Sequence, residues 1–449
     1  MHGSNSSLSE VDLAVVGGGL AGLSAAALVA KAGRSVVLFE QAGAVGGRAA
    51  TQVREGIFFN LGAHALYFWG QAFALLRELD APFSGHFPDP GKSLLLNDQD
   101  EAPLPRGLVS LVQSRLFDFR EKGRLIRFLA TIAKLDSRSL DGVALSDWVR
   151  TTFGALNAAK FMLALFRVST YADQADRVSA GAAIDQLKLA LKSNVWYIDG
   201  GWQSLVDGLH SRAREGGAVI HASTRVKSVH GETDGVTIAL SDGAIVRSRT
   251  AVLAVPPRTA CELLGEACRS PLARWTASSI PIKAACLDVA LDRLERPGHR
   301  FALGLDRPYY YSVHSAAAKL APEGVAVVHV LKYLRQDGDS PAEATEQELE
   351  GCLDRLQPGW RSHILTRRFL PSMIVSNSLP LATENGLAGR PDVTSAGNPN
   401  IFLAGDWVGP EGQLADASAA SARASAQRAL SILAQARPVL KRGSVHVGS

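Results

Sequence analysis

The sequence predicts an α/β fold with a parallel sheet at its core, and three observations near the N-terminus support this. An apolar run, Val11 to Val16, leads directly into a glycine-rich turn at residues 17–22. Small residues with helix-forming tendency follow the turn, and a second apolar run at residues 35–39 ends at Glu40. Strand, turn, helix and strand in this order form a βαβ unit, whose two strands lie parallel.

The glycine turn has the pattern G-x-G-x-x-G. Gly17 permits a tight turn, Gly19 lets the backbone approach a pyrophosphate, and Gly22 lets the helix pack close to the sheet. The N-terminus of the helix offers free N–H groups and partial positive charge to phosphates. Glu40 can accept hydrogen bonds from ribose hydroxyls. The unit therefore predicts dinucleotide binding; the alternative is a glycine-rich turn in another kind of α/β protein.

Later segments indicate which dinucleotide is bound. A second glycine turn, Gly46-Gly47-Arg48, follows Glu40, and a short strand near the C-terminus ends at Gly405-Asp406, before a predicted alanine-rich helix over residues 414–434. Together these segments resemble the flavoprotein superfamily of amine oxidases, carotenoid (phytoene) desaturases and protoporphyrinogen oxidases. The stretches 200–209, 218–229 and 251–257 resemble the same family, so the similarity covers most of the chain.

This resemblance implies noncovalently bound FAD and a glutathione-reductase-type Rossmann FAD-binding domain, interleaved with a mixed α+β substrate domain. The FAD-binding domain is expected to comprise residues 1–70, 196–275 and 376–437. The substrate domain is expected to comprise residues 71–195, mostly helical, and 276–375, richer in strands. Residues 438–449 are expected to form a polar tail.

The resemblance also implies which residues bind the cofactor. In the family, the second glycine turn follows the pyrophosphate and ribityl chain, and the Gly-Asp pair holds ribityl hydroxyls and a phosphate. The start of the last helix faces the flavin pyrimidine ring, a G-x-H loop lies against the flavin, and a middle strand contacts the adenine. The predicted cofactor-binding residues are Gly17, Gly19, Leu20, Ala21, Gly22, Glu40, Gln41, Gly46, Gly47, Arg48, Gly62, Ala63, His64, Val226, Gly405, Asp406, Gln413, Leu414 and Ala415.

Three residues are candidates for chemistry. Lys283 resembles the strand lysine of amine oxidases that reaches flavin N5 through a water; the alternative is a strand lysine that faces solvent. His64 could move protons or bind substrate, or it could brace the flavin loop by donating to a backbone carbonyl. Gln413 stands where amine oxidases place an aromatic residue of a cage around the amine.

Gln413 cannot form an aromatic wall, and residues 376–400 contain no cysteine for a thioether to the flavin. Both points favour the desaturase-like branch. We therefore predict an FAD-dependent oxidoreductase (dehydrogenase or oxidase) that desaturates a lipophilic small molecule by hydride transfer to flavin N5. The alternatives are a flavin amine oxidase, a non-redox flavin-dependent isomerase or cyclase, and a flavin-binding protein without turnover.

Composition limits the partners and the location. The net charge of +4 indicates no nucleic-acid partner, and the four cysteines lack metal-binding spacing, so no metal is predicted. The cysteines are expected to be reduced, buried thiols of a cytoplasmic protein without a secretory signal or membrane span. Residues 108–135 carry cations among apolar residues, which predicts either a solvated helix or peripheral membrane contact. The electron acceptor (oxygen, a quinone or another) and the choice between monomer and homodimer stay open.

Overall fold

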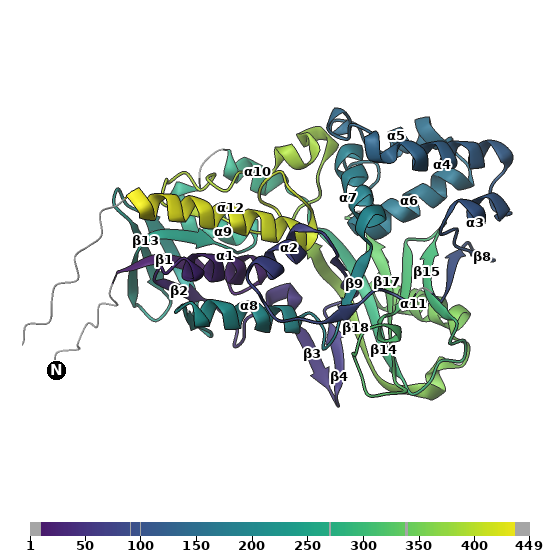
Figure 1. Cartoon of the computed structure of the whole chain (residues 1–449), viewed down its shortest axis with the longest axis horizontal. Helices are drawn as coiled ribbons and strands as arrows, with labels where there is room; N and C mark the ends of the chain where they lie inside the picture. Colours follow the sequence, from purple (N-terminus) through teal and green to yellow (C-terminus); the bar gives the residue numbers. More distant parts are fainter. Residues whose placement is uncertain (1–9, 90, 99, 269–270, 337–339, 436–449) are drawn as a thin grey trace, which may run out of the picture.

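The computed structural model describes residues 10–435 apart from 90, 99, 269–270 and 337–339. The predicted tail at 438–449 lies outside the described residues. Two seven-stranded sheets dominate the described part of the chain. The first sheet and its helices lie on the left of Figure 1, while the second sheet and a group of helices lie on the right.

The first sheet draws its strands from three distant parts of the sequence. Its order is β10-β2-β1-β13-β12-β11, with β19 also paired to β13. β1 runs parallel to both β2 and β13, and β19 runs parallel to β13, so the predicted α/β class is confirmed. The strands are β1 (Val11–Val16), β2 (Val36–Phe39), β10 (Val219–His221), β11 (Val226–Gly231), β12 (Val236–Leu240), β13 (Ile245–Leu253) and β19 (Ile401–Leu403).

Helices with small side chains cover one face of this sheet. Alanine has the highest helix propensity and its short side chain lets two helices approach closely. Ala25 and Ala26 of α1 share a buried core with Ala422 and Ala426 of α12, the yellow helix of Figure 1. The helices of this core are α1 (Leu20–Lys31), α2 (Gln71–Glu78), α8 (Gln203–Glu215) and α12 (Leu414–Gln435). The opposite face of the sheet packs against α9 (Pro257–Leu264) and α10 (Leu272–Ser278).

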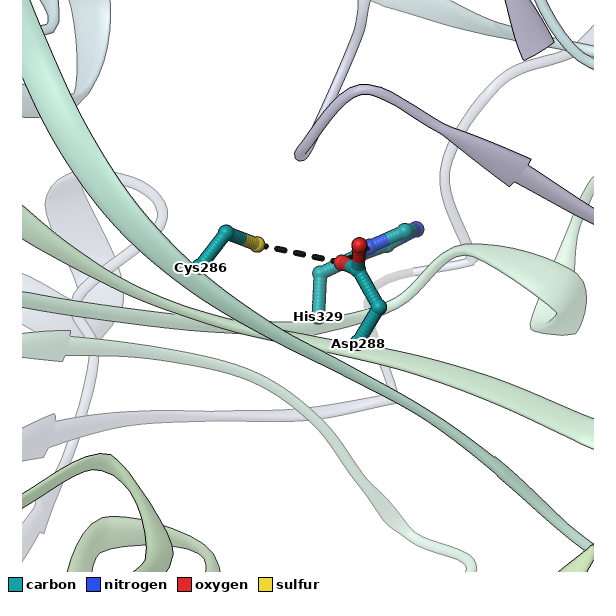
Figure 2. A group of neighbouring side chains, drawn as sticks. All are labelled: Cys286, Asp288 and His329. Atoms are coloured by element: carbon teal, nitrogen blue, oxygen red, sulfur yellow. Dashed lines mark hydrogen bonds and ion pairs between the residues drawn. The ribbon is translucent and has the colours of Figure 1, made fainter. Parts of the chain in front are cut away.

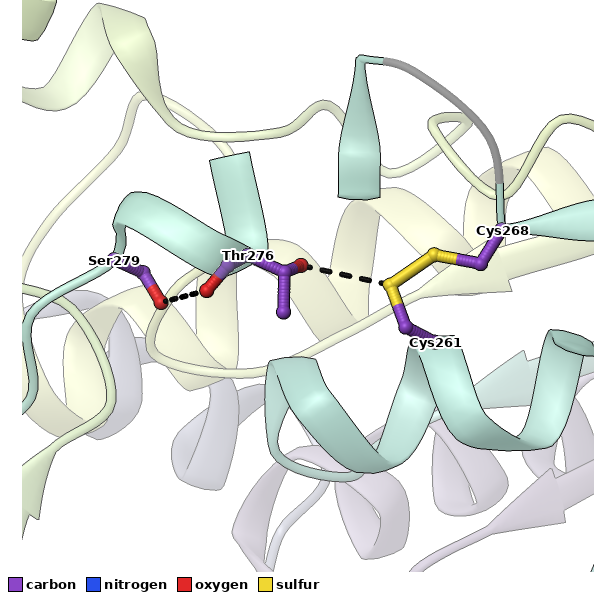
Figure 3. The surroundings of a disulfide bond; sticks show 4 residues. All are labelled: Cys261, Cys268, Thr276 and Ser279. Carbon is purple, nitrogen blue, oxygen red and sulfur yellow. Dashed lines mark hydrogen bonds between the residues drawn. A yellow bond between two sulfur atoms is a disulfide. The ribbon is translucent and has the colours of Figure 1, made fainter. Parts of the chain in front are cut away.

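A disulfide links Cys261 of α9 to Cys268 (Figure 3). The expectation of four reduced thiols is therefore wrong for this pair, while Cys286 and Cys352 are free and buried. After α9 the chain turns back through a short 3₁₀ turn, which brings the two Cα atoms to 5.0 Å. That spacing suits a disulfide, and the seven-residue separation in sequence does not reveal it.

The second sheet has the order β18-β14-β17-β16-β15-β7-β8. One face packs against α11 (Ala342–Leu356), and the other packs against a helical group supplied by residues 108–193. Each sheet thus has its own helices, and the predicted domain boundaries stay a prediction. The strands are β7 (Lys92–Leu96), β8 (Glu101–Pro103), β14 (Ile282–Leu291), β15 (His299–Gly304), β16 (Tyr309–Val313), β17 (Ala326–Leu334) and β18 (Ile364–Ser376); the helices are α3 (Leu108–Gln113), α4 (Phe119–Thr131), α5 (Leu145–Phe153), α6 (Asn157–Thr170) and α7 (Ala180–Ser193).

Short strands join the two parts. The hairpin β3 (Thr51–Arg54) and β4 (Ile57–Asn60) leads into the loop that precedes His64. β9 (Val195–Ile198) pairs with both β5 (Leu66–Tyr67) and β6 (Gly85–His86). The loop and β5 thus lie at the junction of the two sheets, where a large cavity opens.

Candidate cofactor and substrate site

A cavity of about 750 Å³ lies at this junction. Its walls include the glycine turn, the end of β2, the start of α12 and part of β18. Gly17 has a φ of +105°, and a Cβ there would lie 2.4 Å from the Ala254 carbonyl oxygen. A Cβ on Gly22 would lie 1.9 Å from the Gly17 carbonyl oxygen, whereas Gly19 faces open space. The first and third glycines thus permit close packing, and the second leaves backbone accessible in the cavity.

Glu40 follows β2 directly and lines the cavity. Its Oε2 accepts a hydrogen bond from the Gly18 N–H at 2.7 Å, and its Oε1 accepts one from the Ala42 N–H at 2.8 Å. The Gly46 N–H donates to the Gly18 carbonyl at 2.9 Å, which fixes the second glycine turn beside the first. Backbone groups therefore hold the Glu40 carboxylate and both turns along one wall.

Asp406 is a buried carboxylate on the same wall. Arg48 Nη1 donates to its Oδ2 at 2.6 Å, and Asn377 donates to it from both the backbone N–H and the side-chain amide. Burial opposes ionisation of Asp406, but the charge and hydrogen bond of Arg48 and the Asn377 donors outweigh it and lower its pKa to about 2. Asp406 is therefore ionised at neutral pH, with Arg48 as its counter-charge.

His64 lines the cavity at the end of the loop after β4. Its Nδ1 lies 3.0 Å from the Gly62 carbonyl oxygen, which can only accept, so this nitrogen carries the proton. The edge of the ring contacts Trp202 at a centroid distance of 4.8 Å. Burial lowers the His64 pKa to about 4, so the imidazole is neutral at pH 7. These contacts support the bracing role for His64 rather than proton transfer.

Two tyrosines that sequence analysis missed, one from each predicted domain, also lie at the cavity. Tyr171, at the C-terminal cap of α6, donates from its hydroxyl to the Ala63 carbonyl at 2.9 Å. Tyr67 donates to the Ser169 carbonyl at 3.1 Å. Both tyrosines line the cavity, together with residues 370 and 372–375 of β18. Neither tyrosine belongs to a motif, so only the three-dimensional arrangement identifies them.

Two predicted catalytic residues lie outside the cavity wall. Gln413 Nε2 donates to the Ala182 carbonyl of α7 at 2.8 Å, so its amide joins α12 to the helical group. Side chains alternate between the two faces of β14. Lys283 therefore lies on the same face as Ala285 and Leu287, which packs against α11, and on the opposite face from Cys286. The structure therefore supports neither the predicted contact of Gln413 with the flavin nor the predicted approach of Lys283 to N5.

The other predicted cofactor-binding residues form two groups, those outside the cavity wall and those on it. Gly22 and Gly62 also lie outside the cavity wall: Gly22 packs against the Gly17 carbonyl, and a Cβ on Gly62 would meet Met373 Cε. The predicted residues that the structure does bring together around the cavity are Gly17, Gly19, Leu20, Ala21, Glu40, Gln41, Gly46, Gly47, Arg48, Ala63, His64, Val226, Gly405, Asp406, Leu414 and Ala415.

A buried ionic network is centred on Asp288, and Figure 2 shows this residue with Cys286 and His329. Cys286 Sγ donates to Asp288 Oδ1 at 3.1 Å, and His329 Nδ1 lies 2.6 Å from the same oxygen. Arg368 pairs with Asp288 Oδ2 and also donates to the Asn60 carbonyl. Burial opposes ionisation of Asp288, but His329 and Arg368 outweigh it and lower its pKa. The network thus ties β14, β17 and β18 to the start of the loop.

The same three side chains have the chemistry of metal ligands. The candidate ligand atoms of Cys286, Asp288 and His329 lie within 4.8 Å of one another. However, burial first and then the Asp288 charge raise the Cys286 pKa well above its usual value, so the thiol keeps its proton. The Arg368 guanidinium already balances the Asp288 charge, and a second cation beside it would be repelled. We therefore interpret this group as structural support for the loop.

Among the described residues that line the cavity, Trp202 and Asp416 each have a buried side-chain atom without a hydrogen-bond partner, the indole Nε1 and Oδ2. These two atoms are shielded from the cavity, so the accessible glycine turns and the Arg48–Asp406 pair are the features that fit a dinucleotide.

Comparison with known proteins identifies the protein family and, with it, the dinucleotide. Residues 20–430 match the family described as flavin containing amine oxidoreductase. The chain belongs to this family. It is accordingly an FAD-dependent oxidoreductase, and the resemblance and the cofactor predicted from the motifs are confirmed.

Individual relatives share low sequence identity with this chain. A 4,4'-diaponeurosporene oxygenase of Staphylococcus aureus (strain bovine RF122 / ET3-1) is 27% identical over 269 residues, or 52% of this chain and 53% of that protein. The chain thus spans about half the length of the curated relatives it matches. An oxidoreductase from Methanosarcina mazei has a similar structure (TM-score 0.74, 17% identity, 92% of this chain and 99% of that one). So does cyclohexylamine oxidase from Brevibacterium oxydans IH-35A (TM-score 0.69, 15% identity, 94% and 98%).

Proposed function

We propose that this chain dehydrogenates a neutral, lipophilic small molecule at a C–C bond, with noncovalently bound FAD as the hydride acceptor. One observation carries the proposal: among the described residues that line the cavity, those contributed by the substrate domain carry no charge. An apolar substrate gains about 25 cal/mol for each Å² of apolar surface that it buries. The uncharged residues in question are Tyr171, Leu370, Ser372, Met373, Ile374 and Val375.

The remaining walls suit FAD. The N-terminus of α1 would hold the pyrophosphate, Glu40 the adenosine ribose, and the Arg48–Asp406 pair the ribityl chain. FAD supplies the acceptor for the hydride when it is bound. The N-terminus of α12 would stabilise negative charge at the pyrimidine end. Neutral His64 holds the loop in place, and the residues of β18 exclude water from the substrate.

Amine oxidation is the second candidate, because Tyr67 and Tyr171 both line the cavity. The face of an aromatic ring attracts a cation by about 0.5–2 kcal/mol. Sequence analysis recognised no such residues. The tyrosine hydroxyls are held by main-chain carbonyls, so the rings are fixed in position whichever substrate enters.

An anaerobic screen separates the candidates. Neutral ring or polyene compounds should bleach the flavin absorbance, and simple primary amines should bleach it more slowly. Rapid bleaching by primary amines with release of ammonia would favour amine oxidation. Conversion of a substrate without bleaching would favour a non-redox isomerase, and the absence of any conversion would favour a binding protein.

The helices α3 and α4 offer a surface for the membrane contact that a lipophilic substrate would favour. None of the helices in the described ranges combines the length and apolar character needed to cross a bilayer. However, Phe119 is 91% exposed and Val109 is 73% exposed. Lys122 Nζ donates to the Val112 carbonyl at 2.7 Å, which holds the two helices together. The other exposed cations and apolar residues of this segment include Arg106, Leu108, Arg115, Arg120, Arg127 and Leu129.

Exposed apolar side chains flanked by arginines fit the interface of an anionic bilayer. We propose that this surface rests on such a membrane. Cosedimentation should show binding to vesicles that contain phosphatidylglycerol, weakened by Val109→Ser together with Phe119→Ser. Val53→Ser, at an exposed valine of β3, is the matched control. Equal binding by all three proteins, or none by the unmodified protein, would remove the membrane proposal and leave a solvated surface.

A further inference from the structure

Arg390 is a buried cation without a carboxylate in contact with it. It follows the 3₁₀ turn Gly386–Gly389 and is only 7% exposed. Its Nη1 donates to the Gly412 carbonyl at 2.9 Å, which holds the loop that leads into α12. None of the carboxylates in the described ranges forms an ion pair with its guanidinium. A buried charge without a counter-ion is strongly unfavourable, so we looked for one in its surroundings.

Asp406 is close enough to attract Arg390, but its carboxylate is already engaged. Arg48 Nη1 donates to it at 2.6 Å, and Asn377 donates to both of its oxygens. Two guanidinium groups therefore share one carboxylate, and one positive charge remains. Burial lowers the Arg390 pKa to about 10 against the attraction of Asp406, so the group is charged at neutral pH. Arg390 does not line the FAD cavity, so bound FAD would not contact it.

Arg390 lines a small crevice between α10 and residues 378–390. Its Nε is shielded and its Nη1 is bonded to Gly412, so Nη2 is the guanidinium nitrogen left for a ligand. Ser378 lines the same crevice; it is 2% exposed, and its hydroxyl has no hydrogen-bond partner among the described residues. The space of about 10 Å³ admits one particle of about the size of a water molecule or a chloride ion.

The other polar groups at the crevice do not balance the charge. The Ser279 hydroxyl donates to the Thr276 carbonyl at 2.9 Å (Figure 3), and Ser278 donates to carbonyls of its own helix. Glu384 lines the crevice but is exposed and does not pair with Arg390. The donors that stay available are therefore the Arg390 guanidinium and one serine hydroxyl, a combination that suits an anion.

We propose that this crevice binds one small monovalent anion of the size of chloride, held by Arg390 Nη2 and the Ser378 hydroxyl. Such an ion neutralises the buried guanidinium, whereas a water molecule leaves its charge unbalanced and a cation is repelled. Because Arg390 also holds the Gly412 carbonyl, the ion stabilises the loop from which α12 begins.

The first test locates the ion and needs no variant. Bromide is similar in size to chloride, and its anomalous X-ray scattering distinguishes it from water. Crystals of the holoenzyme soaked in sodium bromide should show an anomalous peak in contact with Arg390 Nη2 and Ser378 Oγ. The absence of a peak at this position would overturn the proposal.

The second test measures the thermal unfolding midpoint of the holoenzyme in sodium chloride and in sodium gluconate at equal ionic strength. Gluconate is too large for the crevice, so chloride should raise the midpoint further, in a saturable way. Ser378→Ala should need roughly tenfold more chloride for the same effect. Arg390→Met should lose the chloride effect, while Arg274→Gln, at an exposed cation of α10, should retain it.

Glu384→Gln separates the proposal from a carboxylate that turns toward Arg390. If an ion balances Arg390, this variant should bind chloride more tightly, because a repelling charge is removed. If Glu384 balances it, the variant should unfold at a lower temperature in gluconate, and chloride should have no effect on the unmodified protein. That result, or an equal chloride effect in Arg390→Met, would overturn the proposal. A bromide peak without a chloride effect in solution would show an adventitious ion only and would overturn it too.

Discussion

The two sides of the cavity are organised in different ways. On the FAD side, backbone groups of residues close in sequence make the site: Glu40 is held by the N–H groups of Gly18 and Ala42. On the substrate side, the loop before His64 is supported by a buried pair, Asp288 and Arg368, which are 80 residues apart. The wall formed by the two glycine turns and Glu40 is therefore a local property of the chain, whereas the Arg48–Asp406 pair and the substrate side depend on long-range packing. The predictions below test this contrast, from the largest expected effect to the smallest.

Asp288→Asn should have the largest effect on stability. It leaves the Arg368 guanidinium buried without its counter-charge, and breaking such a pair typically costs about 3–5 kcal/mol. Urea unfolding at neutral pH measures this loss. Asp288→Asn with Arg368→Met removes both charges and should recover part of it, whereas Asp292→Asn, at a half-exposed carboxylate, should change little. A loss below about 1 kcal/mol in the single variant would contradict the role of the pair.

The effect of Asp288→Asn on the free energy of unfolding should also depend on pH. The folded state lowers the Asp288 pKa, so the pair stabilises the protein above the ordinary carboxyl pKa. That stabilisation is lost as the pH falls through the lowered value. The difference in unfolding free energy between the unmodified protein and Asp288→Asn should therefore shrink in acid. A difference that is constant with pH would show that Asp288 acts through packing alone.

Glu40→Ala should affect cofactor binding more than stability. It removes the ribose acceptor and leaves the N–H groups of Gly18 and Ala42 without partners. A lost hydrogen bond to a charged group is worth about 1.5–3 kcal/mol, so FAD affinity should fall roughly tenfold to a hundredfold. Unchanged affinity in a fluorescence titration would place the ribose elsewhere.

The contrast also explains what could be predicted from the sequence. The βαβ unit and the glycine turns are contiguous, so their spacing alone locates most of the FAD wall. Tyr171 and the β18 residues reach the cavity only through tertiary packing, and no local pattern distinguishes them. The face on which Lys283 lies is hard to predict, because in a strand a shift of one residue moves a side chain to the opposite face. Gln413 does precede the last helix as predicted, but its side-chain amide donates a hydrogen bond to the Ala182 carbonyl of α7 and does not line the cavity.

Lys283→Met provides the smallest expected effect. Because Lys283 shares the β14 face that packs against α11, its replacement should leave the rates of flavin reduction and of reoxidation by oxygen unchanged. Stopped-flow absorbance of the flavin measures both rates. A large, selective decrease in the reoxidation rate would restore the predicted approach of Lys283 to flavin N5.

The uncharged substrate side is tested most directly by a matched pair of compounds under anaerobic conditions. The two should share one unsaturated ring skeleton, one neutral and the other carrying a primary amine. Stopped-flow measurement of flavin bleaching gives the rate constant for reduction by each compound. The neutral compound should reduce the flavin faster, with a carbon–carbon double bond formed in the product. Faster reduction by the amine, with release of ammonia, would contradict the account.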